Sequence, residues 1–152
     1  MSVDAKLAEL GLTLPEAMAP VAAYVPVVIA GNLAHVSGQI SIAADGSLIR
    51  GRLGADMDVP AGQEAARRCA LMIVAQLKKA LGDLSGVKRV VKLGVFVQCT
   101  PDFADQPEVA NGASELLVAL FGEAGRHARA AVGVPALPRG VAVEVDAVVE
   151  VR

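Results

Sequence analysis

The hydrophobic pattern near the N-terminus predicts one short helix followed by a β-hairpin. Leucines recur near helical spacing over residues 4–18 but are interrupted by Gly11 and Pro15, which is typical of a short, weakly amphipathic helix. The pattern then changes to that of strands. Two apolar runs within residues 27–36 lie on either side of Gly31-Asn32, and they predict a hairpin with a two-residue turn.

The middle of the chain predicts a loop, a long helix and a buried strand. Residues 43–59 are rich in Gly and Asp, which indicates a loop with at most one short strand. Asp58 suits the N-cap of a helix, Pro60 suits its first turn, and apolar residues then recur on one helical face as far as Gly82. The run 88–99 is apolar at almost every position and predicts a strand.

The last third of the chain predicts a second helix over 108–121 and two strands, 128–134 and 141–151. The order of elements indicates an α+β fold in which two main helices pack on a mixed sheet. Several strands are apolar on both faces, so the face that the helices leave uncovered must be buried by self-association. A closed cyclic oligomer is the usual solution.

The composition favours one compact domain and argues against several classes of function. The chain has 152 residues, 54% of them hydrophobic, which predicts a main domain over 21–152 and an N-terminal helical extension over 1–20. A formal charge of −2 and an aromatic content of 3% disfavour nucleic-acid binding. No signal-peptide pattern or membrane-length apolar run occurs, so we expect a cytoplasmic protein that does not bind membranes.

The cysteines and histidines form no metal-binding pattern. Cys69 and Cys99 are far apart and are expected to be buried structural residues rather than nucleophiles. The chain has only two histidines, His35 and His127, which are too few for a histidine-based zinc site. We therefore expect neither a metal nor another cofactor. His127 could act as a general base, or it could be a solvated or interface residue beside two arginines.

Three residues are candidates for chemistry, each with a structural alternative. Glu144 alternates with buried valines in the last strand, so it either points into water or lines a cleft and orients a water molecule. Arg129, followed by small residues, either binds a carboxylate with both arms of its guanidinium or is a surface arginine. Gly38 either lets a ligand approach the backbone or marks a β-bulge.

These candidates lie within motifs that resemble the RidA/YjgF family, also called L-PSP endoribonucleases or translation initiation inhibitors. The motifs are His35-Val36-Ser37-Gly38-Gln39-Ile40, the strand 91–97, Asp102-Phe103, and Arg129-x7-Leu137-Pro138-x5-Glu144. The resemblance runs from Tyr24 to Arg152 and indicates a longer, less characterised branch of the family. It implies a chorismate-mutase-like fold assembled as a homotrimer, with clefts between the subunits.

The resemblance also implies an activity and the residues that carry it out. Members of the family hydrolyse 2-imino or enamino acids to 2-keto acids and ammonia without a cofactor. Carried over by motif, Arg129 anchors the substrate carboxylate and Glu144 positions or deprotonates the attacking water. The expected substrate-binding residues are Tyr24, Gly38, Asn111 and Ala131.

Two other functions stay open at this point. A non-enzymatic trimer that binds small carboxylates as a sensor or regulator would need Arg129 but not Glu144. Deaminase members commonly carry Cys where this chain has Ala131, which leaves room for that alternative. The third function, endoribonuclease, is disfavoured because neutralising an RNA backbone would depend on a local basic patch such as Arg126 and Arg129.

Overall fold

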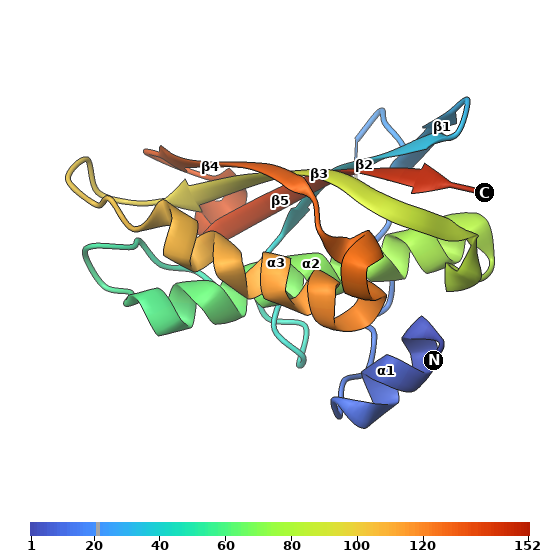
Figure 1. The fold of residues 1–152 in the computed structure, drawn as a ribbon. Coiled ribbons are helices and arrows are strands. Elements are labelled where there is room, and N and C mark those ends of the chain that lie inside the picture. The colour runs from blue at the N-terminus through green and yellow to red at the C-terminus, as the bar shows by residue number, and fades with distance from the viewer. Residues whose placement is uncertain (21) are drawn as a thin grey trace.

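The computed structural model describes residues 1–20 and 22–152, which form a five-stranded mixed sheet covered by helices on one face (Figure 1). The strands are β1 (Val27–Ala30), β2 (Leu33–Ile40), β3 (Val87–Gln98), β4 (Ala128–Val134) and β5 (Val143–Val151). The α-helices are α1 (Val3–Glu9), α2 (Val59–Leu81) and α3 (Gln106–Phe121). Three short 3₁₀ helices are η1 (Leu84–Gly86), η2 (Gly122–Gly125) and η3 (Pro138–Gly140). The predicted α+β fold is confirmed.

The strand order is β1-β2-β5-β3-β4, so β1 and β4 form the two edges of the sheet. Only β3 and β4 run parallel among the described pairs, and α3 forms the crossover between them. The β1–β2 hairpin turns at Gly31-Asn32 as predicted, and Gly31 supplies the positive φ of 61° that the turn needs.

The strand β5 lies at the centre of the sheet and alternates strictly between its two faces. Its odd-numbered residues from Val143 to Val151 are buried beneath the helices, whereas Glu144, Asp146 and Glu150 lie on the opposite face and are partly exposed. This alternation confirms the face assignment made from the sequence. It also places every carboxylate of β5 on the face that no helix covers.

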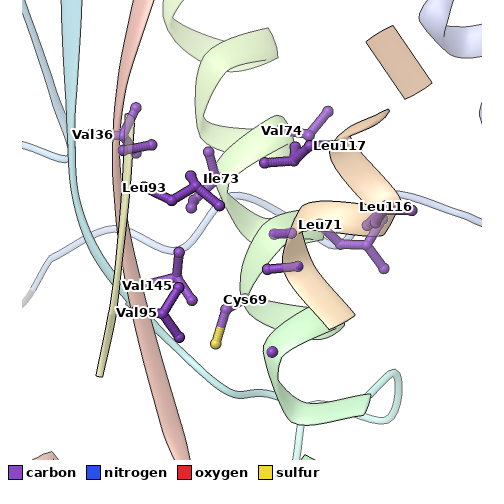
Figure 2. Packing of buried hydrophobic residues seen from close by; sticks show 14 of the residues in the cluster. Val36, Cys69, Leu71, Ile73, Val74, Leu93, Val95, Leu116, Leu117 and Val145 are labelled. Atoms are coloured by element: carbon purple, nitrogen blue, oxygen red, sulfur yellow. The ribbon is translucent and has the colours of Figure 1, made fainter. Parts of the chain in front are cut away.

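The helix α2 forms the centre of the core. The Asp58 carboxylate accepts a hydrogen bond of 3.0 Å from the Ala61 amide, and Gly82 ends the helix with a φ of 81°. Figure 2 shows Cys69 and Ile73 of α2 beside Leu93, Val95 and Val145 of the sheet. The other side of α2 packs against α3.

Both cysteines are buried and free, as the sequence predicts for structural residues. Burial raises the pKa of the Cys69 thiol far above its usual range, so this thiol stays protonated. Cys99 lies just after β3.

The N-terminal segment departs from the prediction. A helix over 4–18 was expected, but α1 ends at Glu9 because Gly11 takes a φ of 70° and the chain then turns away. The irregular segment that follows is tied to α2 by Gln76, whose Nε2 donates to the Met18 carbonyl at 2.7 Å. Residues 10–20 therefore run along the body of the domain as an extended arm.

Both edge strands expose apolar side chains. Val28 and Ile29 of β1 are 52% and 47% exposed, and Val132 of β4 is 45% exposed. Among residues 1–20 and 22–152, no helix covers the face of the sheet opposite α2 and α3 (Figure 1). Within the described part of the chain, no helix is both long and apolar enough to cross a membrane.

Candidate functional site

The residues proposed from the sequence fall into two groups on opposite faces of the sheet. The first group lies along a groove of about 590 Å³ beside β2 and β5, which we call the β2–β5 groove. Its lining includes Met18, Tyr24, Ser37, Gly38, Ile40, Pro138, Arg139 and Glu144. The second group surrounds Arg129 at the β4 edge.

A β-bulge in β2 brings Gly38 against Glu144. The register between β2 and β5 shifts between Val36 and Gln39, so Ser37 and Gly38 are the residues at the bulge. A Cβ atom added to Gly38 would collide with the Oε2 atom of Glu144 and lie 2.9 Å from its Cδ atom. Glycine is therefore required for the carboxylate to occupy this place, and both interpretations of Gly38 hold: it marks a bulge, and it lines a groove.

The Glu144 carboxylate is half-buried, and none of the described residues donates a hydrogen bond to it. Burial raises the pKa of Glu144 above its usual range, and the neighbouring charge of Asp146 raises it further. A carboxylate in this condition binds a proton more readily than a solvated one. It is therefore suited to act as a general base toward a water molecule in the groove.

Tyr24 and Arg139 also line this groove. Tyr24 is 54% exposed and precedes β1, so its ring is free to cover a bound molecule. Arg139 is the one described non-glycine residue with a positive φ, 60°, and its carbonyl accepts a 2.9 Å hydrogen bond from Arg50 Nε. Arg139 is the cation of the groove, and its position in a loop gave the sequence no signal for this role.

On the other face, Arg129 is held by residues of α3. Its Nη1 atom donates to Asn111 Oδ1 at 2.9 Å and to Ser114 Oγ at 3.1 Å, and its Nη2 atom reaches the Pro107 carbonyl at 3.4 Å. Ser114 Oγ also lies 2.9 Å from His127 Nε2. We call Arg129, Asn111, Ser114 and His127 the Arg129 cluster.

The strand register separates the Arg129 cluster from the β2–β5 groove. Arg129 pairs with Leu93 of β3, which pairs with Ala147 of β5, and both partners are buried beneath the helices. Glu144 pairs instead with Phe96 and lies on the uncovered face. Ala131 shares the helix-covered face with Arg129 and packs against the core. Within one chain, Arg129 and Glu144 therefore cannot contact the same small molecule.

Two features of the site were not predicted from the sequence. Gln76 Nε2 donates to Gln39 Oε1 at 3.3 Å as well as to Met18, and this buried pair holds the arm beside the groove. Ser114 joins His127 to Arg129 from the middle of α3. The sequence pattern places Gln76 outside the apolar face of its helix, whereas the structure buries it, so nothing in the sequence indicated either feature.

In the described part of the chain, no three His, Cys, Asp or Glu side chains come close enough together to hold a metal ion. The titratable and charged groups described above include the guanidinium of Arg129, the carboxylate of Glu144 and the imidazole of His127. Their chemistry is anion binding and proton transfer.

Comparison with known proteins agrees with the fold and with the motifs. The sequence model of the family described as YjgF/chorismate mutase-like, putative endoribonuclease matches residues 4–150. The protein TCP17 of Trypanosoma cruzi is 55% identical over 151 residues, which cover 99% of this chain and 94% of TCP17. The family match thus spans almost the whole chain.

Solved structures give the same result at two levels of similarity. A protein of unknown function from Agrobacterium tumefaciens is 48% identical with a TM-score of 0.91, covering 99% of this chain and 94% of that one. A putative endoribonuclease from Shewanella oneidensis is 35% identical with a TM-score of 0.95, covering 99% and 100%.

RidA from a Psychrobacter species is more distant, at 29% identity and a TM-score of 0.63, covering 90% of this chain and 94% of that one. The resemblance seen in the motifs is confirmed. The chain belongs to the YjgF/chorismate mutase-like family.

Proposed function

We propose that this protein is an imine deaminase, which hydrolyses a 2-imino acid to a 2-keto acid and ammonia, at a site shared between two copies of the chain. The observation that carries this proposal is the separation of Arg129 and Glu144 onto opposite faces of one sheet. Arg129 is arranged to bind a carboxylate and Glu144 to accept a proton, but in the described part of one chain the two side chains lie on opposite faces and do not meet. A cleft between the β4 edge of one copy and the β2–β5 groove of another would unite them.

The Arg129 cluster supplies the carboxylate anchor. Asn111 and Ser114 accept from Nη1 and Pro107 accepts one hydrogen of Nη2, so the Nε hydrogen and one Nη2 hydrogen have no acceptor among the described residues. Two parallel donors of this kind fit a planar carboxylate. Because no described carboxylate pairs with Arg129, these donors are available to a ligand.

The groove supplies the base. Glu144 removes a proton from water as the oxygen bonds to the C=N carbon, the electron pair of the C=N π bond moves to nitrogen, and the protonated Glu144 returns that proton to the nitrogen. In the resulting amino alcohol the hydroxyl proton is transferred to nitrogen by way of Glu144, the C–N bond breaks with its electron pair leaving on ammonia, and the oxygen forms the new C=O bond. Positioning the water and one carboxylate suffice for an imine carbon, which is already electrophilic.

The exposed apolar edges support an assembly that brings the two halves together. Val28 and Ile29 at one edge and Val132 at the other are side chains that a contact between different edges would bury. Such a head-to-tail contact closes into a ring, and we propose the homotrimer that the family resemblance implies. Light scattering on the purified protein measures this state directly.

The electrostatics of the groove support a small substrate rather than RNA. Its lining contains one arginine, Arg139, opposite one glutamate, and the whole chain carries a net charge of −2. RNA binding depends on several cations along the backbone.

The test is a coupled assay in which an amino-acid oxidase generates imines and the loss of imine is followed. We expect Arg129→Ala to lower kcat/KM by about 100-fold or more, since charge-assisted hydrogen bonds to the substrate are lost. Arg67→Ala is the matched control, because Arg67 pairs with Glu64 on α2 and belongs to neither half of the site, and it should change kcat/KM little. Equal losses in both variants, or a loss in Arg67→Ala alone, would contradict the anchoring role of Arg129, and wild-type protein without turnover would contradict the deaminase activity.

A further inference from the structure

The hydrogen bonds around His127 fix the protonation pattern of the Arg129 cluster. His127 Nδ1 lies 2.6 Å from the Gly125 carbonyl oxygen, which can only accept, so Nδ1 carries the proton. In the neutral ring Nε2 is then an acceptor, and the Ser114 hydroxyl 2.9 Å away donates to it. Ser114 Oγ meanwhile accepts from Arg129. The hydroxyl proton is therefore committed to His127 and is unavailable to a ligand.

Protonating His127 reverses the direction of one hydrogen bond. Nε2 then donates to Ser114 Oγ, which keeps its second lone pair for Arg129 Nη1. The hydroxyl proton is released and can turn toward an anion on Arg129. A protonated His127 thus adds a positive charge and one more donor to the place where a carboxylate would bind.

The surroundings of His127 favour the neutral form while the site is empty. Burial lowers the pKa of His127 below its usual value, the Gly125 carbonyl raises it in part, and the charge of Arg129 lowers it again. A carboxylate bound to Arg129 would offset that charge and favour the protonated ring. Binding of the carboxylate and binding of the proton then assist each other.

Among the charged groups near His127, Arg129 is the one whose charge affects the pKa of the ring. From η2, Glu123 pairs with Arg126 at 3.8 Å, and both side chains are largely exposed. From β3, Arg89 donates to the Arg126 carbonyl, while Lys92 pairs with Ala128 on the opposite face of the sheet. From α3, Ser114 is the group that reaches the ring.

We propose that the Arg129 cluster is a proton-coupled carboxylate site, in which Ser114 and His127 are positioning residues that take up a proton together with the anion. The proposal rests on the proposed function, since it assumes that Arg129 receives the carboxylate of the substrate or the keto acid product. Carboxylate binding by Arg129 alone would not depend on pH near neutrality, whereas binding coupled to protonation of His127 does. The affinity for a small 2-keto acid rises as the pH falls.

The test measures pyruvate binding by calorimetry at pH 8 and pH 5.5, together with the NMR titration of the imidazole signals. We expect affinity in the wild type to be about fivefold or more tighter at pH 5.5. Pyruvate should raise the titration midpoint of His127, and the signal of His35 on β2 serves as the internal reference. In His127→Gln the affinity should become independent of pH.

Ser114→Ala separates the hydrogen bond from the charge. It should weaken pyruvate binding at pH 5.5 more than at pH 8, and Ser114→Thr should restore it because the hydroxyl returns. Equal affinity at the two pH values in the wild type, or an undiminished pH dependence in His127→Gln, would overturn the proposal. Absence of pyruvate binding at both pH values while deaminase turnover is normal would also overturn it.

The failure of the proposed function has a different signature. If pyruvate and a proton bind together but the protein turns over no imine, the deaminase proposal is wrong and the proposal of a proton-coupled site is supported.

Discussion

The β2–β5 groove and the Arg129 cluster differ in how their charged groups are held. No described residue donates a hydrogen bond to Glu144, and its place is set by the shape of the β2 bulge and by the missing side chain of Gly38. Arg129 instead has three acceptors on α3, two of them side chains within 3.1 Å. Steric contacts thus place the Glu144 carboxylate, whereas hydrogen bonds orient the Arg129 guanidinium.

This difference matches the work that each group is proposed to do. A base must exchange protons, so its carboxylate is left without donors and burial raises the pKa of Glu144. An anchor must keep one orientation, so its donors are fixed before the substrate arrives. Mutations in the groove should therefore lower kcat, whereas loss of Arg129 should weaken binding of the carboxylate.

The largest expected effect is that of Glu144→Gln, which removes the base and keeps the size of the side chain. We expect kcat to fall by about 10²- to 10⁴-fold while pyruvate binding changes little. In the wild type, kcat falls as the pH is lowered through the pKa of Glu144, because the protonated acid cannot accept a proton. Since that pKa is raised, the fall begins at a higher pH than for an ordinary glutamate.

Steady-state kinetics from pH 5 to pH 9 measure both effects, and the acidic limb of the profile should disappear in Glu144→Gln. Normal turnover in this variant would remove Glu144 from the mechanism. Wild-type protein that binds pyruvate but turns over no imine would favour a carboxylate-binding protein without catalysis.

A smaller effect is expected for Gly38→Ala, because the added Cβ collides only with the end of the Glu144 side chain. The Glu144 carboxylate should shift to a new position, whereas the backbone of the domain should stay unchanged. We expect a 10- to 100-fold loss of kcat, roughly the effect of misplacing a catalytic group by about 1 Å. Kinetics and thermal unfolding are measured together.

Gly86→Ala is the control for this substitution, since the nearest atom to its new Cβ is Leu81 Cδ1 at an ordinary 3.5 Å. A Gly38→Ala protein with wild-type kcat would show that the close approach to Glu144 has no catalytic role.

The smallest effect is expected for Gln76→Ala, which leaves the Met18 carbonyl and Gln39 Oε1 without this donor. The loss of stability should be about 1–3 kcal/mol, and the arm over residues 10–20 should exchange its amide hydrogens faster. Gln63→Ala is the control: Gln63 donates to the Glu108 carbonyl at an exposed position, so about 0.5 kcal/mol or less is expected. Equal effects in the two variants would contradict a special role for Gln76.

Local chemistry explains what could be predicted from the sequence. The Asp58 cap, the Gly31-Asn32 turn and the alternation along β5 depend on neighbours in the chain, and all three are confirmed. The helix expected over 4–18 was too long because leucines at helical spacing continue past Gly11, where the backbone has already left the helix.

Long-range contacts explain what could not be predicted. The sequence indicated Gly38 and Glu144 separately, but their contact follows from the pairing of β2 with β5. The support of Arg129 by Ser114 requires α3 to lie against β4, and no spacing in the sequence encodes that packing. The placement of the two half-sites on opposite faces likewise follows from the strand order.

The most direct test of the shared site is to mix two inactive variants. Arg129→Ala and Glu144→Gln subunits carrying different tags are co-expressed, and mixed oligomers are isolated by both tags. If each site takes Arg129 from one copy and Glu144 from another, every mixed trimer contains one site in three with both residues intact, and activity returns. Mixed oligomers that stay as inactive as either parent would contradict the shared site.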